Sequence, residues 1–175
     1  VEPNQNSSYD YDQIVSVGEL LSTTIMHKYL LNLGFDNSLY DARDLIRTDN
    51  SFRNAKIDWE MTENMVNKSL KHKHCITQGF IGCTSENFTT TLGREGSDFS
   101  ASVLAYCLNI SQVIIWKDVP ALMNADPKYF KNTIEIEKIS YDEVIELAYF
   151  GAKIIHPKTV QPLKKKNITL YIRSF

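Results

Sequence analysis

Apolar residues recur at helical spacing near the start of the chain. Between residues 11 and 33 this spacing predicts one long helix, and Gly34 suits its end. We expect Asp10 or Asp12 to cap its start, because a short carboxylate side chain accepts bonds from the first backbone N–H groups. Two stripes have the helical spacing. The apolar stripe consists of Ile14, Val17, Leu21 and Ile25. The polar stripe consists of Ser16, Glu19, Thr23 and His27.

Short apolar runs and further helical patterns alternate along the rest of the chain. Residues 42–57 are predicted as loop with short strands, and residues 85–96 as a glycine-punctuated loop. This alternation predicts an α/β fold with a mainly parallel, covered sheet. The predicted strands are residues 75–82, a central strand at 113–116, and residues 168–175. Two helices are predicted from an Asp58 cap to about Leu70 and over 97–109 with Ser97 as the cap. Two more are predicted nearer the C-terminus: one opened by a Ser140–Glu143 capping box and closed by Gly151, and one begun by Pro157 and limited or bent by Pro162.

Composition fits a globular domain and excludes several classes of protein. The 175 residues are 43% hydrophobic and 23% charged, an ordinary mixture for a chain that buries its own core. A net charge of −2 lacks the basic footprint of a nucleic-acid binder, and no apolar run approaches the ~20 residues of a membrane span. The three cysteines have no framework spacing, which is typical of a reducing compartment. We therefore expect a cytoplasmic protein with neither a nucleic-acid nor a membrane partner.

The pattern of strand, glycine loop and helix over residues 76–109 is the strongest chemical signal. Gly93 and Gly96 permit close backbone approach, and the helix that begins at Ser97 presents unpaired N–H groups that attract anions. The loop matches neither a Walker A sequence nor GxGxxG. From the residues alone it is either an anion site or a plain strand-to-helix connection with capping residues.

Four charged residues near predicted element ends are candidates for ligand binding. Arg94 lies in the glycine loop and can hold a carboxylate or phosphate with two parallel hydrogen bonds. Asp98 is favoured in a first helical turn without any ligand, and it could also orient an ammonium group. Asp118 follows the central strand, where α/β sheets bind ligands, although turn aspartates are common there. Lys153 could reach a phosphate or be merely solvated.

A metal site is not expected. His72, His74 and Cys75 lie together, but they lack a second ligand group at a zinc spacing. Lysines 164–166 are interpreted as a solvated helix end rather than a nucleic-acid patch.

Four consecutive motifs resemble, in sequence and in order, those of aspartate kinase, a family within the amino-acid kinase superfamily. They are TQGFIG, TTTLGREGSD, IWKDVPALMNADP and FGAKIIHP. The resemblance begins at SVGELLST (16–23), passes through DARDLIRTDNSF and extends to the C-terminus. It implies a three-layer α/β sandwich with a mainly parallel central sheet, divided into an aspartate-binding part at about 1–74 and a nucleotide-binding part at about 75–175. The fold is expected to be incomplete, because the family's opening glycine-rich loop with its lysine and its later ACT modules are not in this sequence.

The family transfers the γ-phosphoryl group of ATP to the β-carboxylate of L-aspartate, with Mg²⁺, at the start of lysine, threonine and methionine synthesis. The resemblance implies a homodimer in the intact protein. It also places Asp98 near the catalytic centre. The implied aspartate-binding residues are Glu19, Phe80, Arg94, Ser97 and Asp98, and the implied nucleotide-binding residues are Lys117, Asp118, Met123, Lys128 and Lys153.

The sequence departs from the family at several of these positions. The family usually reads GRGGSD, where this chain has Glu95 in place of a glycine. Lys117 stands where threonine is frequent, and Met123 and Lys128 stand where a tyrosine and an arginine are usual. We expect little or no kinase activity from the 175 residues themselves, because the lysine loop is missing. The alternatives are a relative that acts on glutamate or carbamate, and a non-catalytic ligand-binding or regulatory module.

Overall fold

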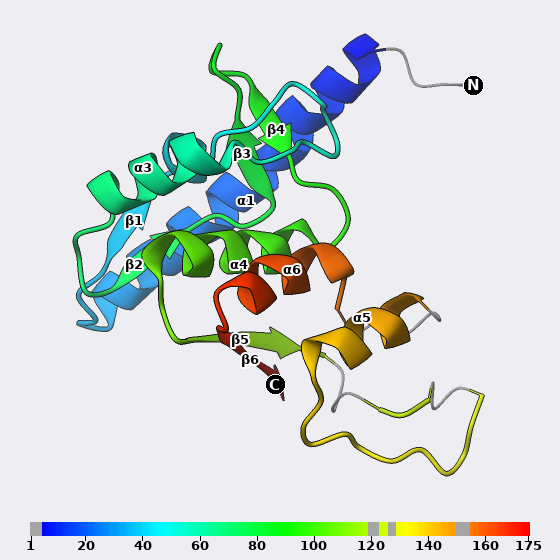
Figure 1. The fold of residues 1–175 in the computed structure, drawn as a ribbon. Helices are drawn as coiled ribbons and strands as arrows, with labels where there is room; N and C mark the ends of the chain where they lie inside the picture. The colour runs from blue at the N-terminus through cyan, green and yellow to red at the C-terminus, as the bar shows by residue number, and fades with distance from the viewer. Residues whose placement is uncertain (1–4, 119–122, 126–128, 150–154) are drawn as a thin grey trace. The chain divides into compact units, whose positions relative to one another are not determined.

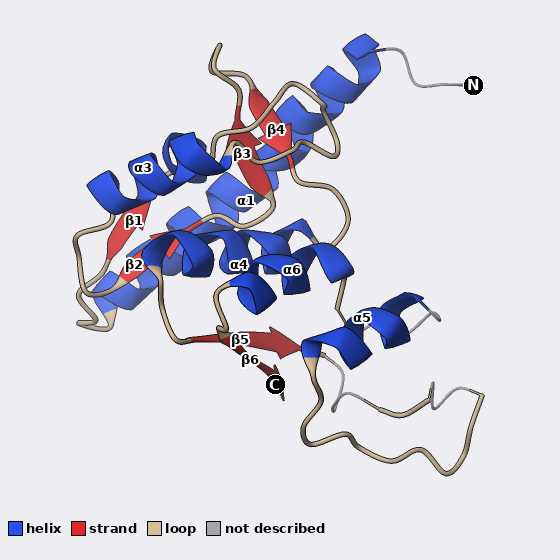
Figure 2. Cartoon of the chain, in the orientation of Figure 1, coloured by secondary structure: helices blue, strands red, loops and turns tan. Residues whose placement is uncertain are grey.

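The computed structural model describes residues 5–118, 123–125, 129–149 and 155–175. The chain divides into two compact units, Val1–Ser100 and Ala101–Phe175, and each is described by itself. Figure 1 shows the course of the chain, and Figure 2 shows helices and strands distributed through both units.

Helix α1 (Gln5–Asn32) is the long helix that the periodicity predicts. Its last residue is Asn32, and Gly34 stops it as expected. The φ of Gly34 is +80°, the left-handed conformation that glycine adopts easily, and the Phe35 N–H donates to the Leu30 carbonyl at 2.9 Å. The predicted N-cap is wrong, because the helix begins at Gln5 and Asp12 lies two turns inside it. A buried role for the Asp12 carboxylate, described below, explains its presence there.

The polar stripe of α1, not its apolar stripe, faces the first unit. Asp12 is 0% exposed and Ser16 is 2% exposed, whereas Ile14 is 72% exposed and Ile25 is 68% exposed. The helix packs against β1, β2 and β4. Gln13 Nε2 donates to the Thr89 carbonyl at 2.8 Å, so side-chain hydrogen bonds attach this helix to the strands.

The first unit holds two small sheets. Strands β1 (Ser38–Tyr40) and β2 (Cys75–Thr77) pair in parallel, and β3 (Ile81–Cys83) and β4 (Thr89–Thr91) pair in antiparallel. Helix α2 (Ala42–Leu45) follows β1, and α3 (Trp59–Ser69) begins at Asp58, whose side chain accepts from the Met61 N–H at 3.0 Å as the predicted cap.

Three sequence predictions about the backbone of this unit are corrected. The segment predicted at 42–57 as loop with short strands begins with the short helix α2 (Ala42–Leu45), which the Asp41 side chain caps. The strand predicted at 75–82 is two strands with different partners, separated where Phe80 adopts a φ of +70° that no strand can hold. The loop predicted at 85–96 contains β4, because three buried β-branched threonines pair with β3.

Helix α4 (Gly96–Leu108) contributes residues to both units. In the second unit β5 (Gln112–Lys117) and β6 (Thr169–Ser174) form a parallel pair. Helix α5 (Tyr141–Tyr149) begins after the predicted Ser140–Glu143 capping box. Helix α6 (Pro157–Lys165) begins at the predicted proline and contains Pro162. Its core consists of Ala105, Val113, Ile115, Ile155, Val160, Leu163 and Ile168.

The central strand predicted at 113–116 is covered on one face only by the described residues of this unit. Ile114 is 43% exposed and Trp116 is 52% exposed, while Val113 and Ile115 are buried in the core. The α/β class and the parallel pairing are confirmed. None of the described helices combines the length with the apolar character that crossing a bilayer requires.

Replacing Gly82 by alanine should destabilise the protein by roughly 1–3 kcal/mol, because the new Cβ would lie 2.9 Å from Thr48 Cγ2 and 3.0 Å from the Ile46 carbonyl oxygen. Gly18→Ala is the matched control, since a Cβ in that part of α1 meets nothing within 4 Å and should stabilise the helix by about 0.5–1 kcal/mol. Urea denaturation of both variants measures the difference. Equal effects of the two substitutions would contradict this packing of β3.

Candidate functional site

A cavity of about 440 Å³ lies in the first unit, beside the start of α4. Segments far apart in sequence form its wall: α1, the loop around residue 53, the bend before β3, and the glycine loop after β4. Its lining residues are Tyr11, Arg53, Phe80, Thr91, Gly93, Arg94, Glu95, Gly96 and Ser97.

The two glycines of the loop stand where neighbouring segments pass closest. A Cβ at Gly93, whose φ is +79°, would lie 2.7 Å from Asn54 Oδ1, and a Cβ at Gly96 would lie 2.6 Å from Phe80 Cδ2. Ser100 holds the same corner from within α4, because its Oγ accepts from the Phe80 N–H and donates to the Gly96 carbonyl, both at 2.9 Å. The loop is therefore packed tightly against the Phe80 bend.

The buried carboxylate of Asp12 joins two of the segments that line the cavity. Its Oδ2 accepts from the Arg53 N–H at 2.9 Å and from the Thr91 N–H at 2.8 Å. Its Oδ1 accepts from Thr91 Oγ1 at 2.8 Å. Three donors thus satisfy a carboxylate that has no access to solvent, and they hold the loop at residue 53 beside the end of β4.

Three of the predicted aspartate-binding residues, Phe80, Arg94 and Ser97, line this cavity. Glu19 and Asp98 are not among the lining residues; Glu19 lies on the inward stripe of α1, and Asp98 lies in the first turn of α4. Burial raises the pKa of the Glu19 carboxyl above its ordinary value of 4.5. The roles of all five remain predictions.

The predicted nucleotide-binding residues belong to the second unit. Lys117 ends β5 and the exposed Asp118 follows it. Met123 forms an isolated antiparallel bridge with Glu135. Lys128 and Lys153 lie outside the described residues. Their roles in nucleotide binding also remain predictions.

Tyr11 and Arg53 are cavity residues that the sequence did not indicate. The Arg53 guanidinium lies over the Tyr11 ring, 4.4 Å from its centroid, in a cation–π contact. Arg53 belongs to a polar, irregular segment with no spacing that predicts a site, and only the fold brings it near residues 93–97. The left-handed φ of +68° at Arg53 appears only in the structure.

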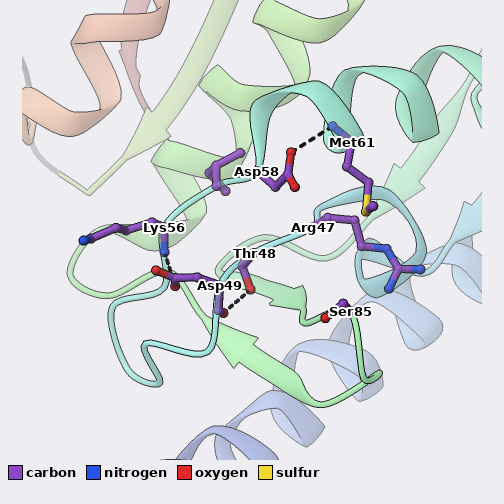
Figure 3. Close-up of a pocket in the computed structure, with 8 residues that line it drawn as sticks. Arg47, Thr48, Asp49, Lys56, Asp58, Met61 and Ser85 are labelled. Atoms are coloured by element: carbon purple, nitrogen blue, oxygen red, sulfur yellow. Dashed lines mark hydrogen bonds between the residues drawn. The ribbon is translucent and has the colours of Figure 1, made fainter.

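A second cavity, of about 330 Å³, lies between the 47–58 segment and Ser85, and Figure 3 shows its lining. Its carboxylates are already used by local structure, because Asp49 accepts from the Lys56 N–H at 2.9 Å and Asp58 caps α3. Among the described residues, no three His, Cys, Asp or Glu side chains gather as a metal site would require. The cavity beside α4 is therefore the stronger candidate for ligand binding.

The sequence of this chain matches the Amino acid kinase family over residues 2–174, and the chain belongs to that family. Lysine-sensitive aspartokinase 3 of Escherichia coli is 37% identical over 93% of this chain and 37% of its own length. Aspartokinase 2 of Bacillus subtilis is 36% identical over 98% of this chain and 42% of its own length. The chain thus spans about two fifths of these two relatives.

The fold agrees with this assignment. The crystal structure of E. coli aspartokinase III in complex with aspartate and ADP superposes with a TM-score of 0.91 at 36% identity, over 96% of this chain and 38% of that one. The chain therefore has the amino-acid kinase fold, and the resemblance in its motifs is confirmed.

Asp12→Asn should lower the free energy of unfolding by about 2–4 kcal/mol, because an amide cannot accept all three bonds and turns an N–H₂ group toward backbone donors. Asp10→Asn, an exposed change two residues earlier in α1, is the control and should stay within about 0.5 kcal/mol. Urea denaturation measures both. A D12N midpoint equal to that of D10N would contradict the role of Asp12 in joining the two segments.

Glu19→Gln should change stability in a pH-dependent way. Burial raises the folded-state pKa of Glu19 above 4.5. The contribution of the Glu19 carboxyl to the free energy of unfolding is therefore fully present below pH 4.5 and is lost as the pH rises through the raised pKa. The neutral glutamine does not lose this stability, so the stability of E19Q relative to the wild type should increase as the pH is raised from 4.5 upward. Denaturation midpoints across that range measure the gain; a constant offset would contradict burial as the cause.

Proposed function

We propose that this chain is part of an aspartate kinase, which transfers the γ-phosphoryl group of ATP to the β-carboxylate of L-aspartate. One observation carries the proposal: the cavity beside α4 contains Arg94 and a helix N-terminus, in a chain 36% identical to an aspartokinase whose structure holds aspartate and ADP. Guanidinium groups and helix N-termini both favour carboxylates.

The unit Val1–Ser100 is the aspartate-binding part in this proposal. The cavity draws Tyr11 and Arg53 from one side of the expected division at residues 74 and 75, and Phe80, Arg94 and Ser97 from the other. Arg94 binds the α-carboxylate of aspartate, and Phe80 and Ser97 complete the contact surface. Glu19 and Asp98 serve the ammonium group and the reacting end of the substrate.

The chemistry needs positioning more than proton transfer. The β-carboxylate has a pKa of about 4, so it is already ionised near neutral pH and needs no general base. One of its oxygens attacks the γ-phosphorus while the bond to the bridging oxygen breaks, which yields aspartyl phosphate and ADP. Charge repulsion between the carboxylate and the triphosphate opposes this step, and cationic groups counter it.

The nucleotide is placed on the second unit, at the carboxyl end of β5, where Lys117 and Asp118 lie. Met123, Lys128 and Lys153 are its remaining proposed contacts. Mg²⁺ enters as MgATP, since this ion is commonly held by phosphates and one or two carboxylates rather than by a protein cage.

We propose that the intact protein is a homodimer. Its proposed role is in amino-acid biosynthesis. A reducing cytoplasm suits its three cysteines, which are all free in the structure: Cys75 is exposed, and Cys83 and Cys107 are buried.

Arg94→Ala should weaken L-aspartate binding by about tenfold or more, because a charge-assisted hydrogen bond to a carboxylate contributes roughly 1.5–3 kcal/mol. Isothermal titration calorimetry on the 175-residue chain measures the affinity without requiring turnover. Arg173→Ala, which removes an exposed guanidinium from β6, is the control and should leave it unchanged. An R94A affinity within twofold of the wild type would contradict the carboxylate-binding role.

A further inference from the structure

The apolar stripe of α1 points away from the first unit and remains open to solvent. Its four side chains, Ile14, Val17, Leu21 and Ile25, are between 49% and 72% exposed. They form one continuous line along the helix, because each lies three or four residues after the one before it. Single exposed apolar side chains are common, but a continuous exposed apolar surface is typical of a protein–protein contact.

Opposite charges stand at the two ends of this stripe. Asp10 lies one helical turn before its first residue, and Lys28 lies one turn after its last. Both side chains are exposed, and neither has an ion-pair or hydrogen-bond partner among the described residues. The other two acidic side chains of this stretch, Asp12 and Glu19, lie on the inward side of the helix, so the outward stripe is uncharged between its ends.

The stripe is complementary to a second copy of itself in the antiparallel orientation. When Val17 of one copy lies beside Leu21 of the other, Asp10 of one copy lies beside Lys28 of the other, because both pairs are centred on the same point of the helix. The same register places Ile14 within one residue of Ile25 of the other copy. Steps of three and four residues are the spacing at which two helices pack side by side along a shared seam.

The end charges select this orientation over the parallel one. In a parallel pair Asp10 would lie beside Asp10 of the other copy and Lys28 beside Lys28, and like charges repel. In the antiparallel pair both ends carry opposite charges. Every contact then occurs twice about a two-fold axis, so the association closes at two copies and forms no chain of molecules.

We propose that the apolar stripe of α1 is a self-association surface, through which two copies of this chain form an antiparallel helix pair. The homodimer proposed above has no assigned interface, and this inference assigns it to α1. The inference uses neither the cavity beside α4 nor the nucleotide. It is therefore independent of the proposed kinase activity, and the two can fail separately.

Sedimentation equilibrium of the 175-residue chain tests the surface. The wild type should show a monomer–dimer equilibrium at micromolar concentrations. Leu21→Lys should raise the dissociation constant of the dimer by about tenfold or more, because the two-fold axis brings the new charge into the apolar centre twice. Thermal midpoints measured at a concentration where the chain is monomeric should not change, since Leu21 is exposed in the single chain.

Met26→Lys is the matched control on the same helix. Met26 is as exposed as the stripe residues, but it lies about 140° around the helix axis from Leu21. The same new charge at this position should therefore leave the dissociation constant within about twofold of the wild type.

Exchange of the end charges tests the orientation and the identity of the partner. Asp10→Lys and Lys28→Asp should each raise the dissociation constant by about threefold or more, because each variant puts like charges opposite one another at both ends. The double variant D10K/K28D restores both pairs only against a second copy in the antiparallel orientation, and it should return to within about twofold of the wild type.

Three results would overturn the assignment. A wild type that stays monomeric at millimolar concentration would leave the stripe to a different partner. An L21K variant that associates as the wild type does would retain a homodimer and move its interface elsewhere. A double variant that associates more weakly than either single charge variant would exclude the antiparallel pair.

Discussion

The buried Asp12 carboxylate is the interaction on which the cavity depends. It lies inside a helix with no solvent access, yet three donors from two distant segments satisfy it. Removing one partner of such a group leaves an uncompensated charge in the interior, which costs far more than the bonds contribute when complete. The carboxylate therefore fixes the loop at Arg53 beside Thr91, two residues before the glycine loop, and so sets the width of the site.

The same logic governs how α1 packs. Besides Asp12, its inward stripe uses Thr23, which accepts from the buried Gln78 at 2.8 Å, and His27, whose Nδ1 lies 2.7 Å from Asn37 Oδ1. Gln78 in turn accepts from the Ala42 N–H at 2.8 Å, at the start of α2. Directional bonds specify one rotation of the helix and one register, whereas an apolar stripe alone would tolerate several.

The sequence predicted those helix starts and ends that depend on residues close by in the chain. The end of α1 at Gly34, the Asp58 cap, the Ser140–Glu143 box and the start of α6 at Pro157 follow from side chains acting on their own backbone. Three features depend instead on partners distant in sequence, and the spacing of residues does not predict them. They are the choice of the polar stripe of α1 as its inward face, the break at Phe80 and the pairing of β4. Of the cavity, the glycine loop and Arg94 were predictable, but Arg53 and Tyr11 reach it only through the fold.

Binding of L-aspartate in the cavity between α1 and the glycine loop, as proposed above, can be observed through backbone amide chemical shifts. In a ¹⁵N-labelled chain titrated with L-aspartate, we expect the largest shifts at the amides of Arg53, Gly93, Arg94 and Gly96. Shifts concentrated instead around the second cavity at Arg47, Lys56 and Asp58, or the absence of any shift at saturating ligand, would contradict it.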